Sequence, residues 1–381
     1  MPASAGAPLY LGLISGTSAD GIDAALVEFA DPSAAARPLK LVAAQTFAYP
    51  PHLRERIVAL AANRASMTLD DYGRLDVEIG ACFADAANAL LHDAAVEAVE
   101  VAAIGSHGQT VCHRPAGSHP FTLQIGDPSV IAERTGITTT ADFRRADIAA
   151  GGQGAPLLPA LHAALFGDAH TPRAVLNLGG IANATLLRPG SEVIGFDTGP
   201  ANCLLDAWAA RHLGTARDES GAWAASGEVR GDLLAAWLQE PYFAAPPPKS
   251  TGREHFNLDW LDMRLPPDVA AADVQATLLA LSARSIADAL RASGVHEVYA
   301  CGGGVHNGAL MAALRAELPN LRLDTTVTLG LDPDFVEATG FAWLARARME
   351  GLPGNLPSVT GARGPRVLGA IYATSSLPMS R

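Results

Sequence analysis

The sequence predicts an α/β protein of two lobes, each a mixed sheet with helices in the order βββαβαβ. Two observations lead to this prediction. The chain has 381 residues, more than the roughly 250 to 300 residues at which a single hydrophobic core usually stops growing. In addition, an apolar strand, a glycine turn and a second apolar strand follow one another twice, first from Leu9 and again from Ala174. Such a repeat indicates two related structural units.

Composition narrows the class of protein. Apolar residues make up 49% of the chain and charged residues 17%, which is typical of a well-packed globular protein. The net charge of -12, without a Lys/Arg-rich run, argues against a nucleic-acid partner. No export signal or apolar window of ~18 residues is found, so we expect no membrane span and a cytoplasmic location. Cys82, Cys112, Cys203 and Cys301 form no CxxC pair, so they indicate neither a zinc site nor a disulfide framework.

The first lobe, predicted for residues 1–145, begins with three strands. The first turn, Ser15-Gly-Thr-Ser-Ala-Asp-Gly21, is unusually polar, and Pro50-Pro51 ends the third strand before two helices. A later buried strand ends in the polar run Ser106-His107-Gly108-Gln109-Thr110. The expected strands are residues 9–14, 22–29, 39–47 and 101–105, the expected helices are 52–62 and 69–95, and a strand–helix–strand unit spans 122–143.

The second lobe is predicted for residues 146–349. The composition changes to Gly, Ala and Pro around Gly151-Gly-Gln-Gly-Ala-Pro156, which indicates a crossing between lobes or a mobile loop. We expect an insertion at about 215–268, and a last segment at about 350–381 that packs back on the first lobe. The expected elements are a strand–turn–strand run across 174–187, strands at 193–197 and 297–301, and helices at 201–213, 273–290, up to 318, and 333–349.

Asp197 is the residue to which we assign the chemistry. It leaves the apolar run Val193-Ile-Gly-Phe196 and meets Thr198-Gly-Pro200, which we expect to end the strand. In open α/β sheets the carboxyl ends of strands face the ligand crevice. A carboxylate there can act as a general base or a metal ligand. The alternative is that Asp197 caps the following helix or satisfies the turn.

Three glycine turns follow strands, at Gly16–Gly21, Gly179–Gly180 and Gly302–Gly304. Backbone N–H groups in such turns can hold phosphate without a net positive charge. Each turn can equally be an ordinary connection. No GxxxxGK[ST] and no intact GxGxxG occur, so a nucleotide-binding fold other than a P-loop or Rossmann unit is needed.

Eight motifs follow one another along almost the whole chain. They are Gly16–Asp23, Ile104–Thr110, Ala141–Arg144, Gly151–Pro156, Asn177–Gly180, Gly195–Pro200, Pro248–Glu254 and Cys301–Gly304. In this order they resemble the anhydro-N-acetylmuramic acid kinase family, within the acetate and sugar kinase, heat-shock chaperone and actin superfamily. This resemblance implies two RNase H-like lobes of the actin and sugar-kinase type that face each other across a nucleotide cleft.

The resemblance implies an ATP-dependent kinase of peptidoglycan recycling. Such an enzyme phosphorylates the 6-oxygen of 1,6-anhydro-N-acetylmuramic acid while water opens the anhydro ring, which gives N-acetylmuramic acid 6-phosphate and ADP. Asp197 is the base that takes the proton of water. ATP and Mg²⁺ are the implied cofactors, and a homodimer is implied. The implied ATP-binding residues are Gly16, Thr17, Ser18, Ala19, Asp20, Gly21, Ile22, Asp23, Gly179, Gly180, Gly302, Gly303 and Gly304.

The remaining positions keep two interpretations. Asp20 and Asp23 are candidates to order the water ligands of Mg²⁺, with turn capping as the alternative. The candidate sugar-binding residues, with a surface or core role as the alternative for each, are His107, Gln109, Arg144 and Glu337; an arginine suits the lactyl carboxylate.

Two other functions compete with this one. A kinase for another sugar or a small carboxylate would share the nucleotide site but would need no base for water. An ATPase that drives partner binding is the third reading, and it is disfavoured because only a short Gly/Pro-rich segment follows the second lobe.

Overall fold

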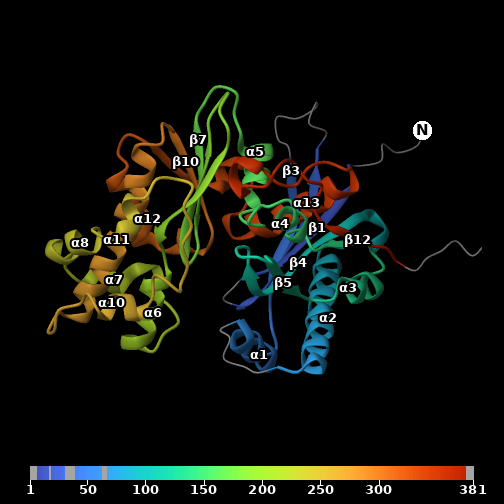
Figure 1. Ribbon diagram of the computed structural model, residues 1–381, viewed down its shortest axis with the longest axis horizontal. Coiled ribbons are helices and arrows are strands. Elements are labelled where there is room, and N and C mark those ends of the chain that lie inside the picture. Colours follow the sequence, from blue (N-terminus) through green and yellow to red (C-terminus); the bar gives the residue numbers. More distant parts are fainter. Residues whose placement is uncertain (1–6, 17–18, 31–38, 62–66, 375–381) are drawn as a thin grey trace, which may run out of the picture. The chain divides into compact units, whose positions relative to one another are not determined.

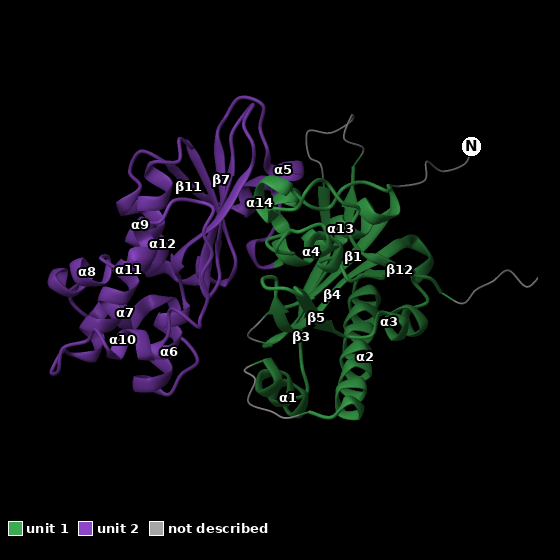
Figure 2. Cartoon of the chain, viewed as in Figure 1, with its two compact units in different colours: residues 1–161, 335–381 green, residues 162–334 purple. Residues whose placement is uncertain are grey.

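The computed structural model describes residues 7–16, 19–30, 39–61 and 67–374. The chain divides into two compact units (Figure 2). Unit 1 contains the chain up to Leu161 and again from Phe335, and unit 2 contains residues 162–334. The predicted boundary at 145/146 therefore lies too early in the sequence, and the predicted second lobe extends too far. Thr17 and Ser18 lie outside the described residues.

Unit 1 is built on a mixed sheet in the order β12-β6-β4-β1-β2-β3, with β5 paired to β4 (Figure 1). β1, β2 and β3 are antiparallel, whereas β4 runs parallel to both β1 and β6. The segment expected to pack back on the first lobe contributes β12, which pairs with β6. The strands are β1 (Leu9–Ser15), β2 (Gly21–Phe29), β3 (Leu39–Ala48), β4 (Val101–Arg114), β5 (Phe121–Ile125), β6 (Thr139–Ala141) and β12 (Ala370–Tyr372).

Helices cover both faces of this sheet. Neighbouring residues of a strand point to opposite faces, so β1 packs against a different helix on each face. Leu11 and Leu13 of β1 join the same buried cluster as the apolar face of α2. Gly12 lies between them and faces α13, whose backbone would clash with any Cβ at this position. The helices of unit 1 are α1 (Pro51–Ala61), α2 (Leu69–Asp93), α3 (Pro128–Thr135), α4 (Arg145–Ala149), α13 (Val336–Met349) and α14 (Pro357–Thr360), with α5 (Leu158–Phe166) running across the boundary.

The position of α13 corrects the sequence prediction, which placed this helix in the second lobe. Gly105 of β4 repeats the feature seen at Gly12, since a Cβ there would meet the carbonyl of Phe341 on α13. Two glycines on adjacent parallel strands thus allow one helix to approach the sheet very closely. This long-range contact, rather than the order along the chain, assigns α13 to unit 1.

Unit 2 repeats the same architecture. Its sheet has the order β11-β10-β7-β8-β9, with β7, β8 and β9 antiparallel and β10 parallel to both β7 and β11. In each unit the first three strands therefore lie side by side in sequence order, and the later strands lie on the other side of the first strand. This confirms the predicted α/β fold of two related mixed sheets. The strands are β7 (Arg173–Leu178), β8 (Ile181–Leu187), β9 (Ile194–Pro200), β10 (Glu297–Cys301) and β11 (Arg322–Thr325).

The core of unit 2 forms around α11, whose predicted apolar face is buried at Val274, Leu278 and Leu281. This helix packs on β9 and on four neighbouring helices. Trp237 and Trp260 are buried in the same cluster, so much of the predicted insertion belongs to the core. The helices are α6 (Cys203–Leu213), α7 (Ala222–Ser226), α8 (Gly231–Trp237), α9 (Pro241–Ala244), α10 (Leu258–Asp262), α11 (Ala271–Arg291) and α12 (Gly308–Glu317).

The glycine-rich segment at 151–154 is not a crossing between units, because it lies wholly within unit 1. The fully buried carboxylate of Asp147 accepts hydrogen bonds from Gly154 N at 2.7 Å, Asn355 Nδ2 at 2.6 Å and Thr360 Oγ1 at 2.7 Å. Gln153 N also donates to the carbonyl of Thr360. These bonds tie the segment to the last part of the chain.

Two further observations concern the described part of the chain. Cys203 and Cys301 are buried, Cys82 and Cys112 are half-buried, and none of the four forms a disulfide. Among the described residues, no helix has both the length and the apolar character that crossing a membrane requires.

Candidate active site

Asp197 lies inside strand β9 and not at its end, which corrects the sequence prediction. It pairs with Asn183 of β8, and Gly199 pairs with Ala182, so Thr198 is an extra residue in the ladder. Such a β-bulge bends a strand and redirects its side chains, and bulges are common beside active sites. Helix α6 begins only at Cys203, after Asn202. Asp197 therefore does not cap this helix.

Residues of α9 and of the loop after it form three hydrogen bonds with Asp197. The backbone N–H of Asp197 donates to the carbonyl of Lys249 at 3.0 Å, and its own carbonyl accepts from Tyr242 Oη at 2.7 Å. Carboxylate oxygen Oδ2 accepts from the N–H of Thr251 at 3.0 Å. Lys249 closes the loop, because Nζ donates to the carbonyls of Tyr242 and Phe243 at 3.0 and 3.1 Å. The side chain and the backbone of Asp197 are thus both fixed.

Burial gives this carboxylate unusual basicity. Desolvation raises the pKa of Asp197 to about 6, the Thr251 hydrogen bond opposes the rise, and the charge of Glu254 adds to it. A carboxyl group with this pKa is mostly ionised at pH 7, yet it accepts a proton more readily than an ordinary aspartate. These are the properties of a general base.

The turn at Gly179 and Gly180 joins β7 to β8 in unit 2. The carbonyl of Gly180 accepts from the N–H groups of Ala201 and Cys203, and the carbonyl of Gly179 accepts from that of Asn202. Both carbonyl oxygens therefore point at the start of α6. This orientation suits an anion site, since carbonyl oxygens facing a phosphate would repel it.

The three glycines after β10 have different roles. Gly302 has a φ of 80°, and a Cβ there would meet Asn177 and Leu178. A Cβ on Gly304 would meet the side chain of Leu178 at 2.6 Å. Both glycines are thus required by packing within unit 2. Gly303 differs, because a Cβ there would meet nothing within 4 Å, so its lack of a side chain leaves space open.

The first glycine turn lies in unit 1 and is only partly described. The carbonyl of Gly16 accepts from Ala19 N and from Gln109 Nε2, both at 3.1 Å, so Gln109 ties β4 to this turn. Gly21 belongs to β2 and is packed against β3. Ile22 is buried in the core. Its side chain therefore packs inside the protein, whatever its backbone binds.

The two predicted magnesium carboxylates have protein partners. Asp20 is exposed and forms an ion pair with Arg54 at 2.7 Å. Asp23 accepts from Thr46 Oγ1 at 2.6 Å. Within the described ranges, no group of three His, Cys, Asp or Glu side chains comes close enough to hold a metal ion. Mg²⁺ needs no such group, because it usually keeps several waters and binds one or two carboxylates together with substrate phosphates.

His107, Arg144 and Glu337, all predicted to bind the sugar, come together in unit 1. Arg144 Nε donates to His107 Nε2 at 3.0 Å, and Arg144 Nη1 donates to the carbonyl of Gly154 at 2.7 Å. Burial lowers the pKa of Arg144 to about 10, and the charges of Glu337 and Asp147 oppose this shift. The His107 ring packs on Phe341 of α13, 4.7 Å away. The displaced helix α13 thus brings Glu337 into this cluster.

His107 is neutral at physiological pH. Burial, followed by the charge of Arg144, lowers the pKa of this histidine well below its usual value. Because Nε2 accepts from Arg144, the proton of the neutral ring resides on Nδ1. Nδ1 is buried, and a backbone interaction with Gly108 partly opposes the fall in the pKa. His107 therefore serves as a neutral support for Arg144.

Sequence reasoning missed the residues that hold Asp197. Tyr242, Lys249, Thr251 and Glu254 lie 45 to 57 positions further along the chain. The available signal was the motif Pro248–Glu254, which was noted only as part of a resemblance. Two contacts of this motif with Asp197 are made by its backbone, at Lys249 and Thr251, and residue types do not reveal backbone contacts.

The two related mixed sheets with glycine turns, together with a family profile that matches nearly the whole chain, identify a phosphotransferase with an alcohol group as acceptor. The family profile described as "Anhydro-N-acetylmuramic acid kinase" matches residues 8–374. The chain belongs to this family.

Relatives named "Anhydro-N-acetylmuramic acid kinase" match almost the whole chain. That of Xanthomonas axonopodis pv. citri (strain 306) is 58% identical over 96% of this chain and 98% of its own. That of Xylella fastidiosa (strain Temecula1 / ATCC 700964) is 55% identical, with 96% of both chains covered. That of Pasteurella multocida (strain Pm70) is 50% identical over 95% of this chain and 96% of its own.

Proposed function

We propose that the protein uses ATP to phosphorylate the 6-oxygen of 1,6-anhydro-N-acetylmuramic acid while water opens the anhydro ring. The products are N-acetylmuramic acid 6-phosphate and ADP. Membership of the family supports the substrate. The observation that carries the reaction type is Asp197, a half-buried carboxylate with a pKa of about 6, fixed through both its backbone and its side chain. The proposal includes a cytoplasmic homodimer that serves peptidoglycan recycling.

The reaction needs a base because the acceptor oxygen carries no proton. The 6-oxygen of the anhydro sugar is bonded to both C6 and C1. A water oxygen bonds to C1, the C1–O6 bond breaks, and the electron pair stays on O6. That oxygen bonds to the γ-phosphorus as the bond to the ADP oxygen breaks. Asp197 takes the proton of the attacking water and later releases it to solvent, so each turnover yields one proton.

Nucleotide binding falls to the glycine turns. In unit 2, the Gly179–Gly180 turn is a candidate for the phosphates because its carbonyls point at α6. Gly303 leaves open space where a ligand can approach the backbone. Bound Mg²⁺ would supply charge neutralisation for phosphoryl transfer. Asp23 fits the role of holding its water ligands, whereas Asp20 would first have to leave Arg54.

Recognition of the sugar falls to the cluster in unit 1. Arg144 uses Nε and Nη1 inside the unit, which leaves Nη2 to donate to the lactyl carboxylate. His107 holds the guanidinium in place and Glu337 balances its charge. Gln109 places the β4 end beside the first glycine turn. A charged hydrogen bond from a buried arginine gives selectivity for an acidic sugar.

The test combines the purified protein with ATP, Mg²⁺ and 1,6-anhydro-N-acetylmuramic acid in ¹⁸O-water. We expect ADP in equal amount to a ring-opened phosphosugar that carries one ¹⁸O on C1 and none in the phosphate. N-acetylglucosamine and acetate serve as alternative acceptors. ADP formed with either of these but not with the anhydro sugar would identify a different kinase of the same class. Label in the phosphate would show attack of water on phosphorus, as in an ATPase.

The pH dependence gives a second check. Asp197 must be ionised to act, so kcat/KM should be full above its pKa of about 6 and fall about tenfold for each unit below it. Glu254→Gln removes a charge that raises this pKa, so the acid limb should shift to lower pH. Ionisation of ATP is unaffected by this substitution. A profile that is flat between pH 5 and 7, or one that Glu254→Gln leaves in place, would rule out Asp197 as the base.

A further inference from the structure

Arg253 lies against the Gly179–Gly180 turn, although 73 positions separate Arg253 from Gly180. Its Nε and Nη2 atoms are 3.0 Å from the position that a Cβ on Gly180 would take, and Cζ is 3.4 Å from it. Gly180 therefore leaves room for a guanidinium as well as for any ligand. A side chain at this position would push Arg253 away.

The same guanidinium is close to the start of α6. Burial raises the pKa of Cys203, the first residue of this helix, to about 11, and the charge of Arg253 opposes that rise. The carbonyls of the glycine turn point at this helix start and not outward. The positively charged guanidinium of Arg253 thus lies beside a turn whose carbonyl oxygens point at α6. This combination favours binding of an anion at the turn.

The charge of Arg253 is not neutralised by the protein. Arg253 is exposed, and among the residues that the structure describes no carboxylate lies within ion-pair distance of it. Two other arginines of unit 2 are paired, Arg211 with Asp262 and Arg264 with Glu240. The chain has a net charge of -12, and Arg253 provides a positive charge beside the glycine turn that is available to an anionic ligand.

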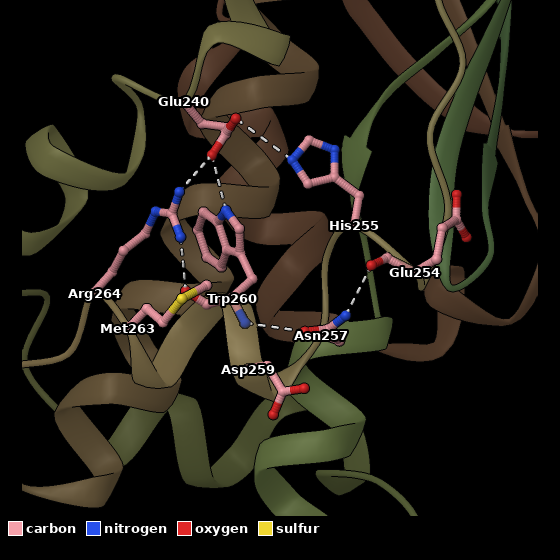
Figure 3. A pocket seen from close by; sticks show the side chains of 8 residues that line it. All are labelled: Glu240, Glu254, His255, Asn257, Asp259, Trp260, Met263 and Arg264. Atoms are coloured by element: carbon pink, nitrogen blue, oxygen red, sulfur yellow. Dashed lines mark hydrogen bonds and ion pairs between the residues drawn. The ribbon is translucent and has the colours of Figure 1, made fainter.

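Hydrogen bonds from Asn257 fix the backbone of the loop that carries Arg253. Asn257 Nδ2 donates to the carbonyls of Arg253 at 3.2 Å and Glu254 at 2.9 Å. Figure 3 shows the pocket on this side, where Glu240 accepts from Trp260 Nε1 and Arg264 Nη2 and lies 3.4 Å from His255. These contacts fix the backbone after Arg253, and the hydrogen bond from Thr251 N to Asp197 fixes it before Arg253, so less freedom is lost when its side chain binds a ligand.

We infer that Arg253 binds the terminal phosphoryl group of the nucleotide at the Gly179–Gly180 turn and stabilises the charge on that group during transfer. This inference rests on the proposed kinase function. A guanidinium presents its donors in a planar fork that matches phosphate oxygens, and it needs no proton transfer. Thr251, two residues earlier, donates to Asp197. One short loop thus places both the base and the cation for the phosphate.

The test compares Arg253→Gln with Arg253→Lys and with Arg315→Gln, a matched loss of charge at an exposed arginine of α12. ADP and a non-hydrolysable ATP analogue are titrated by calorimetry, without sugar. We expect Arg253→Gln to weaken the analogue at least about tenfold and ADP less than threefold, and to lower kcat about 10²-fold or more. Arg253→Lys should recover part of the analogue affinity, and Arg315→Gln should match the wild type.

Equal losses for ADP and the analogue, or no loss for either, would overturn the assignment to the terminal phosphoryl group. Melting temperatures identify any variant that fails to fold, and an exposed residue should change them little. The inference and the proposed function fail in different ways. If the wild type binds nucleotide and phosphorylates the anhydro sugar while Arg253→Gln is unchanged, only the role of Arg253 is lost. If the wild type does neither, the proposed function is lost.

Discussion

Asp197→Asn should lower kcat at least about 10³-fold, leave ATP affinity within twofold, and make the protein more stable at pH 8. Activity falls because the amide keeps the shape of the side chain and can still accept the Thr251 hydrogen bond, but it cannot take a proton from water. Nucleotide binding persists because the glycine turns are unchanged. A variant with near wild-type turnover would remove Asp197 from the role of base.

The gain in stability follows from the sign of the pKa shift. The carboxyl pKa of Asp197 is raised from 3.8 to about 6 on folding. Its favourable contribution is therefore present below the unfolded value and is lost as pH rises through about 6. At pH 8 the native protein holds an ionised carboxylate that burial disfavours. Asparagine is neutral, so we expect about 1 to 3 kcal/mol of added stability at pH 8 and almost none at pH 3.5.

Denaturant unfolding at the two pH values measures this difference. Asp93→Asn is a suitable control, because this carboxylate is exposed at the end of α2 and is not buried by folding. Equal stabilisation by Asp197→Asn at both pH values would show a gain unrelated to ionisation. Destabilisation at pH 8 would show that the negative charge has a favourable partner in the folded protein. Either result would contradict the account of a desolvated base.

Most of the fold could be predicted because local sequence patterns indicate its strands and helices. Runs of apolar residues with glycine turns between them identified most strands of both sheets, although β11 and β12 were not predicted. The one-sided pattern of α11 located its buried face. The assignment of α13 failed for a physical reason. This helix is placed by close contact with Gly12 and Gly105, which lie more than 200 positions away. Nothing in the helix itself indicates which sheet it covers.

The candidate site could likewise be predicted only in part. Asp197 was found because a carboxylate that follows a short apolar run and meets a glycine turn suggests a ligand-facing strand end, but its position in a bulge depends on register with β8. The contacts of Lys249 and Thr251 with Asp197 are made by backbone atoms, which no side-chain pattern encodes. The run Gly302–Gly304 looks uniform in sequence. Only the packing against Leu178 separates the glycines that the fold requires from Gly303.

Gly303→Val and Gly180→Val should each weaken ATP binding about tenfold or more, for different reasons. At Gly303 nothing lies within 4 Å of a new Cβ. The melting temperature should therefore stay near that of the wild type, and the loss should come from blocked approach of the ligand to the backbone. At Gly180 the new side chain also displaces Arg253. Gly231→Val, at another glycine with open space, is the control and should leave nucleotide titration unchanged.

A double-mutant cycle with Arg253→Gln separates the two mechanisms. If Gly180→Val acts partly by displacing Arg253, its effect on the affinity of the ATP analogue should be smaller in the Arg253→Gln background than in the wild type. Gly303→Val should have the same effect in both backgrounds, because no described atom of Arg253 lies within 4 Å of its Cβ position. Full additivity at Gly180 would show that the valine blocks phosphate directly. Unchanged titration of folded Gly303→Val would show that no nucleotide approaches the backbone after β10.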